Sequence, residues 1–249
     1  MNRLTKVKHR LLTFLRDVAR NYLRLEVKPS DVSSRSDLRL MGLLRSRKVT
    51  LVLDIGANNG QFASQLYRNG YSGKTFSFEA IPSVNSDLRR VSLDYRRHWT
   101  VMEPYALSNS DGVSPFRITS SNASSSFFPM TDEFRGHVSF DEECEISVPT
   151  KRLDTALAEY DYSNDTILLK IDVQGAEKLV LEGAPDLLMN VDVVHLELSC
   201  EQLYKGQAMY FEVDSMLRSY GFRLWDCTPF FREKETGRLL QFDGTYLKS

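Results

Sequence analysis

The stretch Val49–Gly60, which reads Val-Thr-Leu-Val-Leu-Asp-Ile-Gly-Ala-Asn-Asn-Gly, decides the fold of this 249-residue chain. An apolar strand reaches Asp54, and the glycine-rich turn Gly56–Gly60 leads directly into a helix. The next strand, predicted over 74–79, ends in the carboxylate of Glu79. A strand, a glycine turn and a helix, followed about 20 residues later by an acid, are typical of the nucleoside sites of α/β folds.

The spacing inside this turn distinguishes between cofactors. A dinucleotide fingerprint has the pattern G-x-G-x-x-G, whereas this chain has G-x-x-x-G, with Asp54 two residues before the first glycine. A carboxylate adds little beside a pyrophosphate, but it favours the ammonium and sulfonium of S-adenosylmethionine, and Glu79 suits the ribose diol. S-adenosylmethionine is therefore the predicted ligand. A nicotinamide or flavin dinucleotide and a purely structural turn are the alternatives.

Length and composition indicate one globular domain with a small extension. The net charge of −1 gives no overall field that would attract nucleic acid. Cys144, Cys200 and Cys227 are widely spaced and form no C-x-x-C pair, so we expect a reducing, cytoplasmic compartment. No apolar run reaches the roughly 18 residues of a membrane span.

The first 28 residues differ from the rest because they hold eight Lys or Arg and only two acids. They predict a basic amphipathic helix, followed by a linker over Ser30–Asp37. We expect an extension over 1–37 and a domain over 38–249. The helix could lie peripherally on an anionic inner membrane surface, or pack on the domain or on a partner subunit of a homo-oligomer. Its apolar residues at helical spacing are Leu4, Val7, Leu11, Phe14, Leu15, Val18, Tyr22 and Leu25.

Strands and helices alternate along the rest of the chain, which predicts a Rossmann-like α/β fold with a mostly parallel sheet and helices on both faces. The near-continuous apolar runs at 51–55 and 167–171 indicate strands that are buried on both faces. The tail, with a turn near Gly237, predicts an antiparallel addition at the sheet edge. Strands are predicted over 49–54, 74–79, 99–106, 166–172, 191–198, 222–226 and 240–247, and helices over 60–69, 83–94, 152–160, 175–183 and 207–220.

Residues 108–145 are the irregular part of the sequence. A tight turn at 108–112 predicts a hairpin into 113–118, and a run rich in serine follows. Long polar loops in α/β domains are either functional or disordered. Phe127, Phe128 and Phe134 favour a lid over the cofactor or acceptor rather than a disordered surface loop.

A second polar cluster follows the strand near residue 170. Lys170 and Asp172 share one face of this strand because side chains alternate along it. Asp54, Glu79 and Asp172 all lie at the carboxyl ends of strands, so we expect them to converge on one cleft. Asp172 is the predicted base for a hydroxyl acceptor, or the ligand of a divalent ion such as Mg²⁺ that lowers the hydroxyl pKa. Lys170 would keep Asp172 ionised or would lower the pKa of the acceptor itself; a structural ion pair is the alternative.

Two residues of the neighbouring strand are further candidates. His195 is an alternative base because its unperturbed pKa is about 6.5, although it could equally be a hydrogen-bonded core residue. Glu197 shares the face of His195, near the carboxyl end of the strand, and could serve either the site or the structure.

Several segments together resemble the FkbM family of S-adenosylmethionine-dependent methyltransferases, in the order in which that family carries them. The resemblance covers roughly residues 49–200. The segments are Leu53–Phe62 (LDIGANNGQF), Phe78–Pro82 (FEAIP), Ala106–Ser108 (ALS), Lys170–Glu177 (KIDVQGAE) and Val180–Gly183 (VLEG).

The resemblance implies a class I methyltransferase fold, with a seven-stranded sheet and a reversed last strand. It also implies methylation of a hydroxyl, often on a sugar, a glycolipid or a natural-product glycan. The turn after Asp54 would hold the methionine end, Glu79 the ribose and the 106–108 segment the adenine. The predicted cofactor contacts are Asp54, Gly56, Ala57, Asn58, Asn59, Gly60, Phe62, Glu79, Ala80, Ala106, Leu107 and Ser108.

Two departures from the family pattern bear on these predictions. Ala80 stands where a proline often follows the ribose acid, and Gln174 replaces a frequent glutamate, which leaves metal dependence open. A methyltransferase acting on nitrogen or carboxylate, and a non-catalytic cofactor-binding subunit, are the alternative functions. The presence of both Lys170 and Asp172 argues against a non-catalytic subunit. The sequence has no basic stripe interleaved with aromatic residues, so it does not predict a nucleic-acid substrate.

Overall fold

The computed structural model describes residues 3–25 and 30–249, with side chains from residue 12 onward. The chain divides into two units, residues 1–43 and 44–249, where a boundary after residue 37 was predicted. The first unit contains α1 (Arg3–Leu23), which coincides with the predicted basic helix. A further helix, α2 (Ser36–Arg47), begins inside the predicted linker and continues into the second unit.

The second unit is built on a seven-stranded sheet with the order β3-β2-β1-β7-β8-β10-β9. β10 runs antiparallel to β8 and β9, and the pairings from β3 to β8 are parallel. The reversed last strand, β10, therefore lies inside the sheet. The antiparallel hairpin of β9 and β10, with its turn near Gly237, is the addition at the sheet edge that the sequence predicted, and β9 is its outermost strand. The strands of this sheet are β1 (Leu51–Ile55), β2 (Lys74–Phe78), β3 (Trp99–Val101), β7 (Ile167–Ile171), β8 (Val191–Ser199), β9 (Phe222–Arg232) and β10 (Leu239–Lys248).

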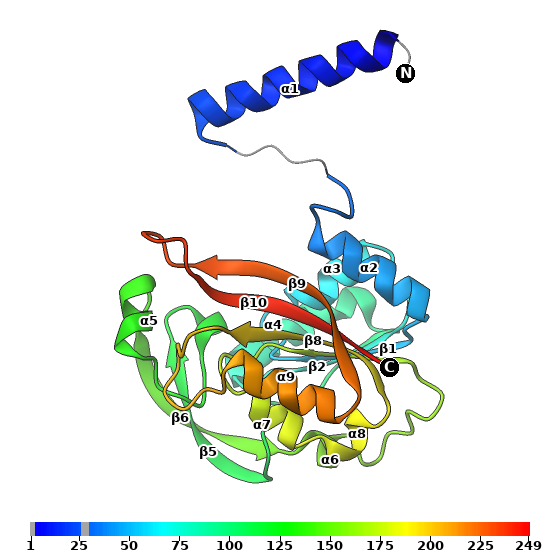
Figure 1. Ribbon diagram of the computed structural model, residues 1–249. Coiled ribbons are helices and arrows are strands. Elements are labelled where there is room, and N and C mark those ends of the chain that lie inside the picture. The colour runs from blue at the N-terminus through cyan, green and yellow to red at the C-terminus, as the bar shows by residue number, and fades with distance from the viewer. Residues whose placement is uncertain (1–2, 26–29) are drawn as a thin grey trace. The chain divides into compact units, whose positions relative to one another are not determined.

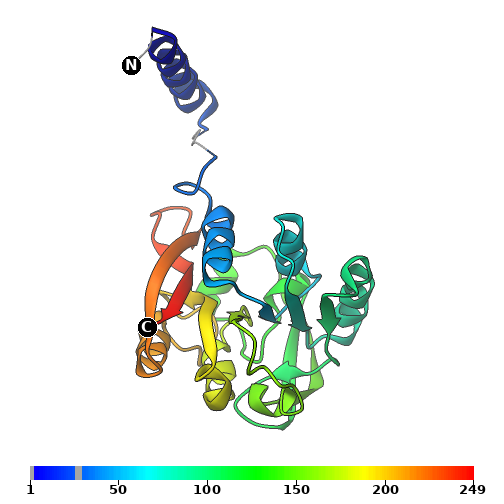
Figure 2. The ribbon, with the colours of Figure 1, turned by 90° about the vertical axis from the view of Figure 1, so that its right-hand side faces the viewer.

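Helices cover both faces of this sheet, as predicted (Figures 1 and 2). Alternate residues of β1, β7 and β8 pack with α7, α8 and α9 into the main apolar core. A smaller cluster joins α3 and α4 to Trp99 on β3. The helices are α3 (Gln61–Arg68), α4 (Pro82–Ser92), α6 (Leu153–Ala156), α7 (Glu177–Glu182), α8 (Pro185–Leu188) and α9 (Tyr210–Ser219), and η1 (Leu93–Tyr95) is a short 3-10 turn.

A second, three-stranded sheet with the order β4-β6-β5 occupies much of the region expected to be a lid or a loop. The strand predicted over 99–106 is split between the two sheets, because Pro104 has no N–H with which to continue a ladder. α6 is also shorter than the helix predicted over 152–160. The elements here are β4 (Ala106–Leu107), β5 (Gly112–Thr119), η2 (Asn122–Ser124), α5 (Asp132–His137) and β6 (Glu142–Lys151).

The phenylalanines of this region are packed rather than solvated. Phe127 contacts Phe116 edge to face, and Phe134 does the same with Tyr204. Packing against these aromatic rings explains why the region contains phenylalanines, which a disordered surface loop would not require.

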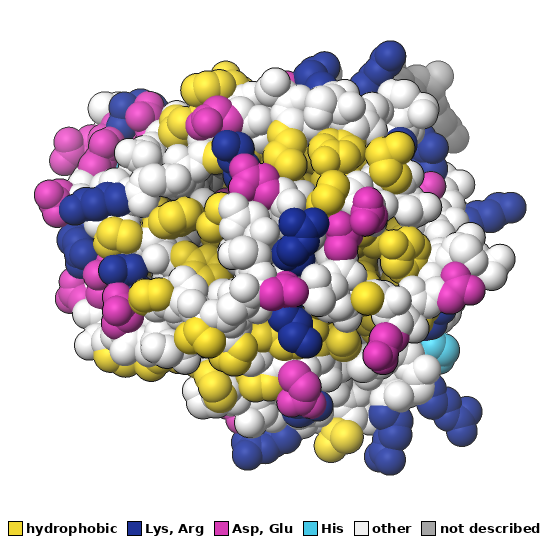
Figure 3. All heavy atoms as spheres, turned by 90° about the horizontal axis from the view of Figure 1, so that it is seen from below, with side chains coloured by type: hydrophobic (Ala, Val, Ile, Leu, Met, Phe, Trp, Pro, Cys, Tyr) yellow, Lys and Arg dark blue, Asp and Glu magenta, His cyan; other side chains and the backbone are white. Residues whose placement is uncertain are grey.

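The surface differs from this apolar interior. The face drawn in Figure 3 mixes acidic, basic and apolar side chains. Ion pairs such as Arg90–Asp87 (2.7 Å) are largely exposed and contribute little to stability. The fold therefore depends on its buried apolar core.

Candidate active site

Two adjoining cavities open at the carboxyl ends of β1, β2 and β7. The first, which we call the Glu79 pocket, lies between the two sheets. The second, which we call the Lys170 cavity, has a volume of about 400 Å³ and lies over β7, β8 and β10. The cavities meet at the turn after β1 and at the end of β7, where both are lined by Gly56, Asn58, Ala123 and Asp172.

The glycine turn is shaped by its protein neighbours. Gly56 has φ +73°, and a Cβ there would lie 1.8 Å from the carbonyl oxygen of Asp172. Gly60 has φ +77° and begins α3, where a Cβ would lie 2.6 Å from the Trp99 ring. Both glycines are thus required by close packing inside the protein. Asn58 completes the turn, and its Oδ1 is buried without a hydrogen-bond partner.

Glu79 follows β2 and forms one wall of the pocket named after it. Its Oε2 accepts the backbone N–H of Asn58, and its Oε1 accepts that of Ile81, each at 2.9 Å. Burial raises the pKa of Glu79 against the opposing effect of these two donors. The donors fix the carboxylate in one orientation, and the second lone pair of each oxygen is left for a ligand.

The strand register places a row of polar side chains across the face of the sheet that α3 covers. Asp54 on β1 is level with Ser77 on β2 and with Lys170 on β7. Lys170 is level with His195 on β8, which is level with Thr245 on β10. Their immediate sequence neighbours point into the main apolar core, because side chains alternate along a strand.

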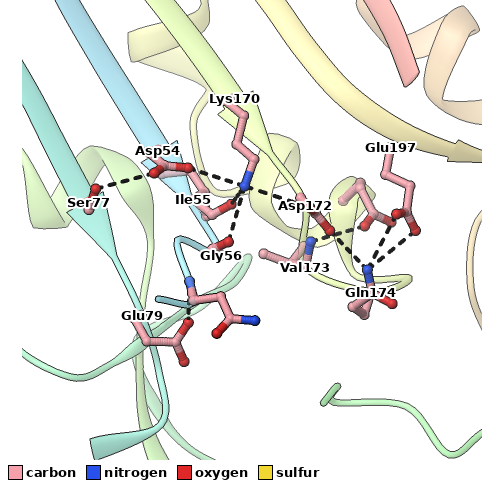
Figure 4. A network of polar contacts seen from close by, with 12 residues as sticks. Asp54, Ile55, Gly56, Ser77, Glu79, Lys170, Asp172, Val173, Gln174 and Glu197 are labelled. Atoms are coloured by element: carbon pink, nitrogen blue, oxygen red, sulfur yellow. Dashed lines mark hydrogen bonds and ion pairs between the residues drawn. The ribbon is translucent and has the colours of Figure 1, made fainter. Parts of the chain in front are cut away.

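Lys170 is the centre of this row (Figure 4). Its Nζ lies 3.1 Å from Asp54 Oδ1 and 3.7 Å from Asp172 Oδ2, and it donates to the carbonyl of Gly56 at 3.1 Å. Burial alone would lower the pKa of Lys170, but the two carboxylates raise it above its ordinary value. Lys170 therefore stays charged and links the β1 turn to the end of β7.

Asp54 lies behind this lysine rather than in the cleft. Its side chain is fully buried, and Oδ2 accepts the hydroxyl of Ser77 at 3.3 Å. It lines neither cavity, so it acts on a ligand only through Lys170 and the turn.

Asp172 stands where the two cavities meet, and its side chain is 42% exposed. Gln174 Nε2 donates to Asp172 Oδ1 at 2.9 Å, while Lys170 lies near the other oxygen. The carboxylate is therefore held from both sides and still faces the cleft. Gln174, which departs from the family pattern, has φ +54° and takes part in the site directly.

Further carboxyl groups line the Lys170 cavity. Glu197 on β8 is level with Asp243 on β10, and Glu197 accepts hydrogen bonds from Gln174 and Gln241. Burial, followed by the charge of Asp172, raises the pKa of Glu197 well above its usual range and that of Asp243 to about 7. The cavity thus holds carboxyl groups that retain protons more readily than Asp or Glu in water.

His195 is a poor candidate for the base. Its Nδ1 lies 2.9 Å from the hydroxyl of Thr245, and its ring stacks on Phe62 of α3 at 5.9 Å. Burial and the charge of Lys170 lower the pKa of His195 to about 4. It is a neutral, weakly basic part of the cavity wall.

Most of the residues predicted from the sequence are gathered at the two cavities. The predicted cofactor contacts Asn59, Gly60 and Ser108 line neither of them, like Asp54. The Glu79 pocket contains Gly56, Asn58, Glu79, Ala80, Ala106, Leu107 and Asp172, and the Lys170 cavity contains Gly56, Ala57, Asn58, Phe62, Lys170, Asp172, His195 and Glu197.

Several lining residues were not predicted. Tyr105, Phe116 and Phe127 reach the Glu79 pocket from the second sheet and its neighbours. Of these, only Phe127 belonged to the aromatic residues that the sequence associated with a lid over the cofactor or acceptor. Asp243 was also missed, although a carboxylate in the apolar strand segment 239–248 was an available signal.

The divalent ion considered for Asp172 is not supported. Within residues 12–25 and 30–249, no three His, Cys, Asp or Glu side chains are grouped so as to hold a metal ion. The ammonium of Lys170 supplies the positive charge among these carboxylates.

The sheet order with its reversed last strand, together with a cleft at the carboxyl ends of the strands, defines a class I S-adenosylmethionine-dependent methyltransferase. The model of the methyltransferase FkbM domain matches residues 54–224. The chain therefore belongs to the FkbM methyltransferase family.

The sequence identity between this chain and individual relatives is low. The chain is 28% identical over 181 residues to the 2-O-methyltransferase NoeI of Sinorhizobium fredii (strain NBRC 101917 / NGR234), covering 68% of this chain and 72% of that protein. Among solved structures, magnesium protoporphyrin IX methyltransferase from Synechocystis PCC 6803, which was solved with bound S-adenosylmethionine, is 11% identical with a TM-score of 0.46 and covers 95% and 96% of the two chains. Fibrillarin from Aeropyrum pernix is 12% identical with a TM-score of 0.45, covering 80% and 66%. These structural likenesses add nothing to the assignment from the family match.

Proposed function

We propose that the protein transfers a methyl group from S-adenosylmethionine to a hydroxyl of a sugar, in a free glycan, a glycolipid or a natural-product glycan. The observation that carries this proposal is the Lys170 cavity, where carboxyl and amide side chains surround a space of about 400 Å³ next to Asp172. Carboxylates and amides accept and donate the hydrogen bonds that a ring of hydroxyl groups requires. The name of the Sinorhizobium relative agrees with a hydroxyl acceptor.

The side chains that line the Glu79 pocket suit the nucleoside part of S-adenosylmethionine. Glu79 would accept hydrogen bonds from the ribose diol, and the aromatic rings of Tyr105, Phe116 and Phe127 offer apolar surface for the adenine. The unpartnered Oδ1 of Asn58 would accept a donor from the methionine end, where the two cavities meet. The bound cofactor supplies an electrophilic methyl group on its sulfonium.

In this proposal, Asp172 is the general base. Its carboxylate accepts the proton of the acceptor hydroxyl while that oxygen forms the new bond to the methyl carbon and the C–S bond breaks in line. Lys170 and Gln174 each contact one oxygen of Asp172 and hold its carboxylate in one orientation. Glu197 and Asp243, whose pKa values are raised, would bind other hydroxyls of the acceptor as hydrogen-bond donors or acceptors.

A transfer assay with methyl-labelled S-adenosylmethionine tests this function. The acceptor panel contains neutral oligosaccharides, together with matched amino sugars and sugar acids. We expect a mass gain of one methyl group on a neutral sugar, with the label stable to base and therefore present as an ether. Transfer confined to the amine or the carboxylate of the matched sugars would contradict the proposal.

A further inference from the structure

The helix α1 carries an apolar stripe that the rest of its own unit leaves uncovered. Phe14 is 63% and Tyr22 is 82% exposed. Leu15, Val18 and Tyr22 follow the i, i+3, i+7 spacing of one helix face. Exposed apolar residues concentrated on one side of a helix mark a surface that binds another apolar phase. The large exposed apolar residues in this segment are Leu12, Phe14, Leu15, Tyr22, Leu23 and Leu25.

The other side of α1 is strongly basic. The helix contains six Lys or Arg and one acid, and Arg16 and Arg20 lie one turn apart, away from the apolar stripe. Since residues 1–28 carry +6 and the whole chain carries −1, the remaining residues carry −7. The first 28 residues thus carry a net positive charge, whereas the rest of the chain carries a net negative charge.

This combination defines the chemistry of the partner. Apolar residues flanked by a basic face match the boundary between acyl chains and anionic headgroups, where a helix lies in the membrane plane. A second copy of α1 would bring two equally basic helices together, and like charges oppose that contact. No helix among the described residues is long and apolar enough to cross a membrane.

We propose that α1 docks the protein on an anionic lipid surface. The apolar stripe enters the acyl boundary, and the basic face contacts lipid phosphates. This proposal does not depend on the identity of the methyl acceptor, because it rests only on the exposure and charge of α1.

Vesicle flotation of the full-length protein tests the proposal. The probes are vesicles of phosphatidylcholine alone and vesicles of equal parts phosphatidylcholine and phosphatidylglycerol, at low salt and at about 1 M salt, where the Debye length is about 3 Å. We expect binding to the anionic vesicles at low salt, weak binding to the neutral ones and strong weakening by salt.

Two double variants separate the contributions of the faces. Arg16→Glu with Arg20→Glu should weaken binding to anionic vesicles at least tenfold, because each basic residue near an anionic surface contributes about 1 kcal/mol. Leu15→Ser with Tyr22→Ser should weaken it through the loss of apolar burial. The matched control is Arg96→Glu with Arg97→Glu, the same charge change at exposed residues of the second unit, and it should bind like the wild type.

Calorimetric titration with S-adenosylmethionine shows that each variant is folded. Equal vesicle binding by the wild type and the α1 variants would overturn the proposal. The proposal would also be overturned if the protein did not bind anionic vesicles and instead sedimented as a dimer. In that case the Leu15→Ser, Tyr22→Ser double variant would dissociate the dimer.

Discussion

The two halves of the cleft use different chemistry. The Glu79 pocket combines apolar walls with the carboxylate of Glu79, which backbone N–H groups hold in place, and it shares Asp172 with the other cavity. The Lys170 cavity is lined by several carboxyl groups around one ammonium. A pocket of the first kind suits one fixed ligand, whereas one of the second kind can exchange protons and bind many hydroxyls. The comparison suggests that cofactor binding and acceptor chemistry can be disrupted separately.

The largest effect is expected at Asp172, between the two halves. Asp172→Asn keeps the size of the side chain but removes the base, so methyl transfer should fall by about 10²- to 10⁴-fold. Binding of S-adenosylmethionine should change little. Steady-state transfer rates and a calorimetric titration measure the two effects, and full activity of the variant would exclude Asp172 as the base.

Lys170 is expected to matter for the fold as well as for the reaction. Lys170→Met leaves the fully buried Asp54 without its partner at 3.1 Å. Breaking a buried ion pair on one side costs about 3–5 kcal/mol of unfolding free energy. Urea denaturation measures the loss.

The matched control for Lys170→Met also replaces Asp54, whose carboxylate would otherwise be left without its partner. In the double variant with Asp54→Asn, much of the lost stability should return because no uncompensated charge is left. A Lys170→Met protein as stable as the wild type would show that the pair does not organise the site.

A smaller, pH-dependent effect is expected at Asp243, in the Lys170 cavity. Because burial raises its pKa from 3.8 to about 7, the folded protein holds this proton more tightly than the unfolded chain. The stabilisation is complete below about pH 4 and is lost as the pH rises through about 7, at up to about 1.4 kcal/mol per pH unit. Urea denaturation between about pH 5 and about pH 8 should show that Asp243→Asn reduces the slope by its own contribution, while Glu197, whose pKa is also raised, continues to contribute. A slope identical to that of the wild type would refute the assignment.

The smallest effect is expected at Phe62, on the wall of the Lys170 cavity. Its ring stacks on His195 and lies 5.6 Å from Lys170 Nζ. Such contacts contribute about 1 kcal/mol, so Phe62→Leu should raise the KM for the acceptor by a few-fold. The affinity for S-adenosylmethionine should be unchanged; a loss confined to the cofactor would place Phe62 in the other half.

The sequence predicted the parts of the site that depend on local pattern. Alternation along one strand joined Lys170 to Asp172, and the family match supports the methyltransferase assignment. The sequence did not predict contacts that depend on the register between strands. Asp54 is paired because it is level with Lys170, and Asp243 enters the cavity because antiparallel pairing sets it opposite Glu197. Of the second sheet, the sequence predicted β5 as a strand over 113–118 but missed β6, although Cys144, Ile146 and Val148 alternate with more polar residues. The antiparallel pairing of β5 with β6 joins segments far apart in the chain, so local pattern does not reveal it.

Calorimetric titration of S-adenosylmethionine into the wild type, Glu79→Gln and Asp243→Asn tests the division of the cleft most directly. The wild type and Asp243→Asn should bind equally well. Glu79→Gln should bind about ten- to a hundredfold more weakly, because a hydrogen bond to a charged group contributes about 1.5–3 kcal/mol. Equal affinity of Glu79→Gln and the wild type, or an equal loss in both variants, would contradict the account.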